Sequence, residues 1–74
     1  MIIQMSIKND MGDFFSEKME VSKEQYLELI DISKKFYSDD NGFEMWVDDG
    51  FMVFPPDIVK KSILCINVLE YDEE

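Results

Sequence analysis

Alternating apolar and polar residues at the N-terminus predict a strand. Ile3, Met5 and Ile7 fall on one side of this segment, which is the period-two pattern of a half-buried strand. Turn-forming residues occupy 9–13, and a second short apolar segment covers 14–19. The first twenty residues therefore predict an antiparallel hairpin.

A helical pattern follows this hairpin. Ser22 and Gln25 have the spacing of a capping box, in which each residue's side chain bonds the other's backbone N–H. The spacing predicts a helix over 23–38, with its acidic residues facing solvent. The residues expected on its core side are Tyr26, Leu29, Ile30, Ser33, Phe36 and Tyr37.

Residues 43–54 carry the strongest local signal, that of a second hairpin. Two apolar segments flank Asp48-Asp49-Gly50, which predicts a three-residue loop with glycine in the left-handed position. In this register one face carries Phe43, Met45, Val47, Phe51 and Val53, which we expect in the core. The opposite face carries Glu44, Trp46, Asp48, Met52 and Phe54.

The C-terminal third predicts one more strand. Pro55 and Pro56 end the hairpin, because neither has an N–H for a sheet ladder. We expect 57–61 to form a single turn or a bulge. Residues 62–69 are almost continuously apolar, which is typical of a central strand covered on both faces. We expect 70–74 to be a frayed acidic tail.

The expected order is β-β-α-β-β-β in a single domain of residues 1–74. One helix packed on an antiparallel or mixed sheet gives a small two-layer α+β fold. We place the 43–54 hairpin at the centre of that sheet, and the order of the other strands stays open.

The charge balance indicates the kind of partner. Seventeen acidic residues against seven basic ones give a formal net charge of -10 and a pI near 4.2, which disfavours direct binding to nucleic acid or an anionic membrane. Because 46% of the residues are hydrophobic and 14% aromatic, the chain is also too apolar for a disordered acidic tail. We expect a folded protein with a basic protein partner.

The composition argues against an enzyme. The chain has no histidine and one cysteine, Cys65, so His/Cys metal clusters and Ser/His or Cys/His pairs cannot be built. The Asp, Asn and Gly residues do not have the register of a calcium loop either. We expect no catalytic residues, no metal and no cofactor.

Cellular location is inferred from the same residues. A single cysteine cannot form an internal disulfide, so we expect a reducing compartment. Cys65 lies in an apolar strand and is expected to be a packing residue. No basic leader with a long apolar stretch is present, and the longest apolar run is too short to cross a bilayer. These features predict a cytoplasmic protein.

Acidic residues gather between positions 39 and 57, where no basic residue occurs. They are either ordinary solvated loop residues or a carboxylate surface that imitates phosphates, since cross-strand neighbours lie about 5 Å apart. The acids on the helix are better explained by an ordinary pair between Asp31 and Lys35. The candidate electrostatic contacts are Asp39, Asp40, Glu44, Asp48, Asp49 and Asp57.

Trp46 and Phe54, with Met52 beside them, are expected on the sheet face that a single helix leaves open. An apolar patch rimmed by acids is typical of a protein interface, so Trp46 and Phe54 are candidate anchors. Two alternatives stay open for this face: the N-terminal hairpin covers it, or the register is off by one residue. A homodimer formed through this face, or through the edge of the N-terminal hairpin, is the alternative function.

Acids at Asp39-Asp40, at Asp48-Asp49 and at the end of the chain, 71–74, in a small protein without catalytic residues, resemble those of phage-encoded inhibitors of host nucleic-acid machinery. Anti-CRISPR proteins and DNA mimics are such inhibitors. The codon bias implied by the absence of Ala, Thr and Arg agrees with a low-GC bacterium or its phage. The resemblance implies an inhibitor that blocks a basic nucleic-acid-binding host protein, such as a CRISPR effector or restriction enzyme, with carboxylates in place of phosphates.

Overall fold

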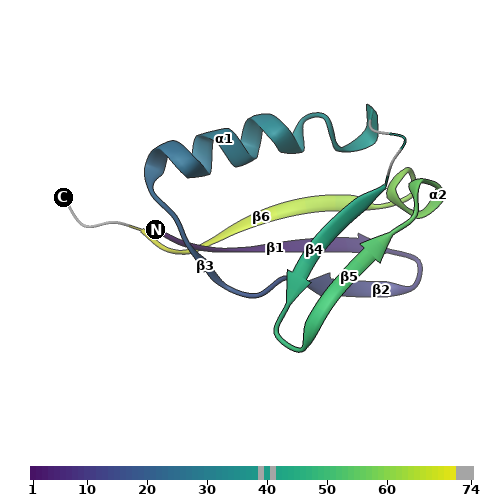
Figure 1. The fold of residues 1–74 in the computed structure, drawn as a ribbon, viewed down its shortest axis with the longest axis horizontal. Coiled ribbons are helices and arrows are strands. Elements are labelled where there is room, and N and C mark those ends of the chain that lie inside the picture. Colours follow the sequence, from purple (N-terminus) through teal and green to yellow (C-terminus); the bar gives the residue numbers. More distant parts are fainter. Residues whose placement is uncertain (39, 41, 72–74) are drawn as a thin grey trace.

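The N-terminal strand β1 (Ile2–Asn9) is the centre of the main sheet in the computed structural model (Figure 1). It pairs antiparallel with β6 (Ile63–Glu70) along one edge. Two short strands share the other edge, β2 (Gly12–Phe15) and β3 (Met19–Glu20), and both are antiparallel to β1. The predicted N-terminal hairpin is thus confirmed, with its second arm split in two. The structure describes residues 1–38, 40 and 42–71.

Ser16 causes the split between β2 and β3. The Ser16 N–H still donates to the Met5 carbonyl at 2.8 Å, but the Met5 N–H donates to Ser16 Oγ at 2.9 Å. The Ser16 carbonyl accepts from Gln4 Nε2 at 2.9 Å. A side chain thus replaces one backbone bond of the ladder, and the chain turns away from β1 before it returns at β3.

The second hairpin is a separate two-stranded sheet, formed by β4 (Phe43–Val47) and β5 (Gly50–Phe54). It is fixed beside the segment after β2, where the Glu17 N–H donates to the Trp46 carbonyl at 3.0 Å. Our placement of this hairpin at the centre of the main sheet was wrong, because β1 occupies that position. Figure 1 shows the two strands crossing in front of β1 and β2, away from α1 (Lys23–Ser33).

The capping box at the start of α1 is confirmed. The Gln25 N–H donates to Ser22 Oγ at 3.1 Å, and the Ser22 N–H donates to Gln25 Oε1 at 2.8 Å. The helix ends at Ser33 rather than at residue 38, and a separate 3-10 turn, η1 (Phe36–Ser38), follows. This tighter turn places the Phe36 side chain in the core, where it is 5% exposed.

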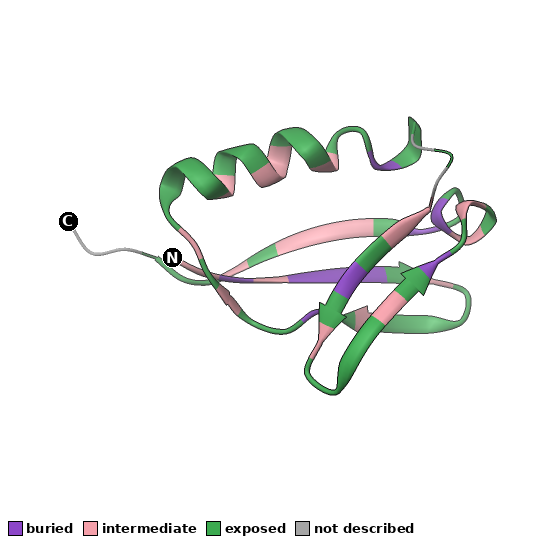
Figure 2. Cartoon of the chain, viewed as in Figure 1, coloured by how far each residue is buried: buried purple, intermediate pink, exposed green. Residues whose placement is uncertain are grey.

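The main hydrophobic cluster takes one buried residue from each of five elements, and Ile3 and Met5 of β1 are buried as well. Figure 2 shows how the buried positions are distributed over the fold. Edge-to-face aromatic contacts join its parts: Phe14 and Phe54 have ring centroids 5.6 Å apart, and Phe36 and Phe43 have theirs 5.1 Å apart. The short helix α2 (Pro56–Val59) begins directly after Pro55. The buried members are Ile7 of β1, Phe36 of η1, Met45 of β4, Phe54 of β5 and Val59 of α2.

The expectation that residues 62–69 form a central strand was wrong. Among the described residues β6 pairs only with β1, and its residues Ile63 and Leu69 are 61% and 48% exposed. The strand covered on both faces is β1, in which Met5, Ser6 and Ile7 are consecutively buried. The first residue of the expected frayed tail, Glu70, belongs to β6, and residues 72–74 lie outside the described residues. The α+β fold with one main helix on antiparallel sheets is confirmed.

We predict that Gly42→Ala strongly destabilises the fold. Gly42 has a φ of +84°, and a Cβ there would lie 2.3 Å from the Phe54 carbonyl oxygen. We expect the free energy of unfolding to fall by about 2 kcal/mol or more, measured by urea denaturation. Gly12→Ala is the control. Gly12 also has a positive φ, +134°, but a Cβ added there would have no atom within 4 Å beyond its neighbours in the chain. Equal losses in the two variants would contradict the proposed clash.

Candidate functional site

The loop of the β4–β5 hairpin contains two residues, Asp48 and Asp49. Val47 pairs directly with Gly50, so Gly50 is the first residue of β5 and the predicted three-residue loop was wrong. Gly50 still has a positive φ, +156°, as expected for the glycine at this turn. Because side chains alternate along a strand, removing one residue from the loop reverses the faces of the whole of β5.

This reversal corrects one of the predicted anchors. Phe54 pairs with Phe43 on the inner face and is 4% exposed, so the prediction that it anchors a partner was wrong. Met52 pairs with Met45 on the same inner face. The alternative register, one residue off, is therefore confirmed.

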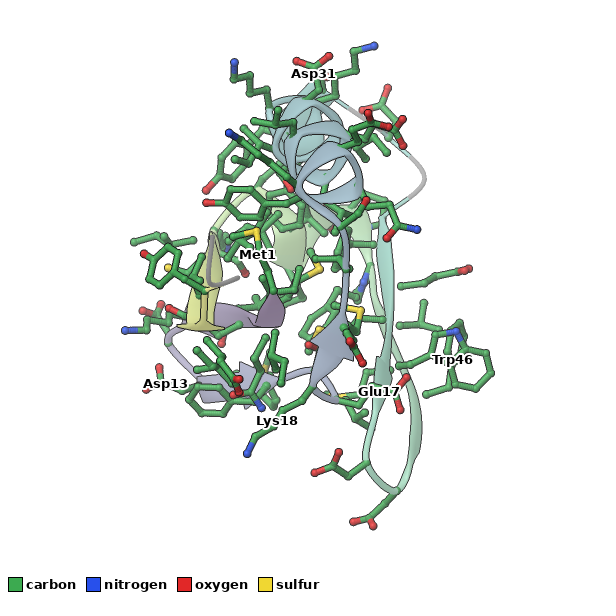
Figure 3. All side chains as sticks on the ribbon, turned by 90° about the vertical axis from the view of Figure 1, so that its left-hand side faces the viewer. Met1, Asp13, Glu17, Lys18, Asp31 and Trp46 are labelled. Carbon is green, nitrogen blue, oxygen red and sulfur yellow. The ribbon has the colours of Figure 1, made fainter. Side chains whose placement is uncertain are left out.

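The outer face of the hairpin presents three apolar side chains, which we call the hairpin patch: Trp46, Phe51 and Val53. They are 64%, 47% and 60% exposed, respectively. Trp46 and Phe51 are cross-strand partners with ring centroids 4.9 Å apart and ring planes inclined at 56°. Figure 3 shows Trp46 pointing away from the body of the molecule. In the described part of the chain the N-terminal hairpin leaves this tryptophan uncovered.

Acidic residues lie along the edges of the hairpin patch. Glu44, the cross-strand partner of Val53, is exposed on the same outer face. Asp48 and Asp49 form the exposed loop at one end of the hairpin. Glu17, which the sequence did not indicate, is exposed and hydrogen-bonded through its N–H to the backbone of Trp46.

Two of the remaining acidic candidates lie toward the other end of the hairpin. Asp40 precedes β4, and Asp57 lies in α2, directly after β5; both are exposed. Asp39 lies outside the described residues. The structure therefore brings Glu44, Asp48 and Asp49 together with Trp46 and places Asp40 and Asp57 apart from them.

The spacing of these acids determines what they can do. Glu44 and Asp48 are four residues apart, which corresponds to about 13 Å along an extended strand. That is wider than the ~5 Å separation of direct cross-strand neighbours. The carboxylates thus form a rim around an apolar centre rather than a continuous row, which is the anatomy of a protein interface.

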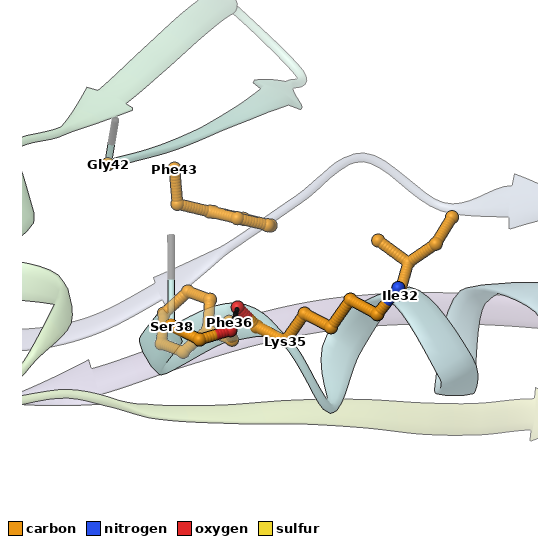
Figure 4. A pocket seen from close by; sticks show the side chains of 6 residues that line it. All are labelled: Ile32, Lys35, Phe36, Ser38, Gly42 and Phe43. Atoms are coloured by element: carbon orange, nitrogen blue, oxygen red, sulfur yellow. Dashed lines mark hydrogen bonds between the residues drawn. The ribbon is translucent and has the colours of Figure 1, made fainter. Parts of the chain in front are cut away.

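A cavity of about 360 Å³ lies on the opposite, inner side of β4, between the end of α1 and the hairpin (Figure 4). Its lining consists of Ile32, Lys35, Phe36, Ser38, Gly42 and Phe43. The Ser38 hydroxyl already donates to the Lys35 carbonyl at 2.9 Å. Small-molecule sites combine an apolar lining with several convergent polar groups. The described lining offers too few such groups, so the hairpin patch is the stronger candidate site.

Comparisons with protein-family models, with curated proteins and with solved structures found no match to this chain. Within residues 1–38, 40 and 42–71, no helix is long and apolar enough to cross a membrane. The same residues contain no cluster of three or more His, Cys, Asp or Glu side chains that would hold a metal ion.

The two phenylalanines of β5 provide a test of the hairpin register. We expect Phe54→Ala to lower the free energy of unfolding by about 3–5 kcal/mol, because it empties a buried site. Phe51→Ala on the exposed face should cost less than about 1 kcal/mol. Urea denaturation of both variants measures the difference, and the opposite ranking would overturn the two-residue loop.

Proposed function

We propose that this protein is a non-enzymatic inhibitor, of the kind that phages encode, which binds and blocks a basic nucleic-acid-handling protein of its host. The docking surface is the hairpin patch with its acidic rim. The observation that carries the proposal is the Trp46–Phe51 pair, exposed on an open sheet face beside Glu44, Asp48 and Asp49.

The apolar centre supplies the affinity in this proposal. Exposed aromatic pairs on a small protein are unfavourable in water, and removing apolar surface from water contributes about 25 cal/mol per Å². Tryptophan is enriched among the residues that dominate interface energies. Trp46 is the only tryptophan of the chain, and the Phe51 ring lies against it.

The carboxylates supply speed and orientation. A negative surface accelerates encounter with a positive one, while single exposed charges add little to affinity. Asp48 and Asp49 project from the tip of the hairpin, so they would meet the partner's Arg and Lys side chains at the edge of the contact. There they take the positions that nucleic-acid phosphates would otherwise occupy.

In this proposal the protein inhibits its partner by occupying the partner's basic nucleic-acid-binding surface, and it turns over no substrate. The test is capture of partners from a low-GC bacterial lysate on the immobilised protein, followed by competition with DNA or RNA. The proposal requires a retained protein with a basic surface that nucleic acid displaces. A partner without such a surface would refute it.

We predict that Trp46→Ala weakens binding to the captured partner by about 30-fold or more, in line with interface residues that contribute 2 kcal/mol. Isothermal titration measures the loss. Phe15→Ala is the matched control, because Phe15 is a half-exposed aromatic residue on β2, outside the β4–β5 hairpin. In the native chain, the fluorescence of Trp46 should shift to shorter wavelength on binding. Equal losses in both variants would show that the patch is not the contact.

We predict that neutralising the acidic rim acts mainly on the rate of association. The triple variant Glu44→Gln, Asp48→Asn and Asp49→Asn should associate about tenfold more slowly at low salt and depend less on salt. The control is Glu20→Gln, Glu28→Gln and Asp31→Asn, which changes the net charge equally at exposed positions of β3 and α1. If the control slows association as much, net charge rather than the rim drives encounter.

A further inference from the structure

The strand β6 has an open edge. It is eight residues long, pairs with β1 on one side, and has no other strand beside it in the described part of the chain. Natural proteins protect such edges with lysine or proline, because unpaired N–H and C=O groups invite another strand. Residues 63–69 contain neither proline nor any charged residue.

The charge around β6 differs from that of the rest of the molecule. Between Asp57 and Glu70 the chain has no acidic residue and two lysines, Lys60 and Lys61, which are exposed in the turn before β6. The strand therefore has a basic beginning and an acidic end. Each copy carries a net charge of -10, but residues 58–69 contain no acidic residue. Electrostatic repulsion between two copies is therefore weakest where these segments meet.

We propose that β6 pairs antiparallel with β6 of a second copy about a two-fold axis, forming a continuous sheet across a homodimer. The antiparallel orientation places Lys60 and Lys61 of each copy beside Glu70 of the other, whereas a parallel one would align like charges. The surface is thus complementary to itself, as a two-fold interface requires. This self-complementarity selects a second copy over an unrelated extended peptide.

The exposed apolar residues of β6 define the register. A two-fold axis normal to the sheet keeps each side chain on its own face of the sheet. Such an axis passes between two copies of one central residue, which then lie opposite each other. If that residue is Ile66, Ile63 of one copy lies opposite Leu69 of the other. These side chains are 61% and 48% exposed, and Leu69 has no partner in β1. The register therefore covers the two most exposed apolar residues of the strand.

This interface is independent of the proposed inhibitory function. The hairpin patch belongs to the β4–β5 sheet, whereas the dimer uses only the edge of β6 and the turn before it. Self-association is measured on the purified protein without any partner. Failure of one proposal therefore leaves the other standing.

The test is sedimentation equilibrium over a concentration series, with charge reversals at the two ends of β6. Lys60→Glu with Lys61→Glu, and separately Glu70→Lys, should each raise the dimer dissociation constant about tenfold or more, because each places like charges together. Combining all three substitutions in one chain should bring the dimer dissociation constant back to within about threefold of the native value. Lys34→Glu with Lys35→Glu is the control, since it changes net charge as the first variant does but lies at the end of α1.

Cross-linking gives a second readout that does not depend on the charge variants. Cys65 is the only cysteine and lies near the middle of β6, so a short bismaleimide should join two copies of the native protein. Circular dichroism checks that each variant remains folded. The proposal is overturned by a native protein that is monomeric at all concentrations. It is also overturned by a dimer that Trp46→Ala dissociates and Glu70→Lys does not, or by a triple variant that fails to restore pairing.

Discussion

The hydrogen-bonding of β1 along both of its edges is the constraint on which the other elements depend. One edge holds β6, and the other is divided between β2 and β3. The division occurs at Ser16, whose hydroxyl accepts the Met5 N–H in place of a backbone carbonyl. Because the chain leaves β1 at this point, the Glu17 N–H is free to bond the Trp46 carbonyl. The second hairpin is thereby held against the main sheet, and its inner residues complete the core.

The sequence predicted best the elements whose signals lie within a few residues. The capping box of Ser22 and Gln25 and the strand end at Pro55 depend only on local backbone chemistry, and both are confirmed. The end of α1 was placed too late, because burial of Phe36 in a 3-10 turn depends on distant core residues rather than on a local stop signal. Strand order is a long-range property too. An apolar segment such as 63–69 looks the same in sequence whether it lies at the centre of a sheet or at an uncovered edge.

The candidate site was partly predictable for the same reason. Trp46 lies on β4, before the loop, so its exposure did not depend on the loop length, and it is on the outer face as expected. Phe54 lies on β5, after the loop. Because the predicted loop was one residue too long, Phe54 was placed on the outer face, and Phe51 and Val53 were placed on the inner face. A two-residue Asp-Asp loop with Gly50 opening the strand would have identified the correct pair. The proximity of Glu17 to Trp46 arises from tertiary structure and has no counterpart in the sequence pattern.

The length of this loop links stability to the proposed docking surface. β4 and β5 send alternate side chains to the core and to solvent, so the residues of the two faces are interleaved along the same two strands. A register in which Gly50 belonged to the loop would turn Phe51 and Val53 inward and expose Met52 and Phe54. That one-residue shift of register would remove Phe54 from its contact with Phe14 and separate Phe51 from Trp46. The core and the hairpin patch therefore both depend on the register in which Val47 pairs with Gly50.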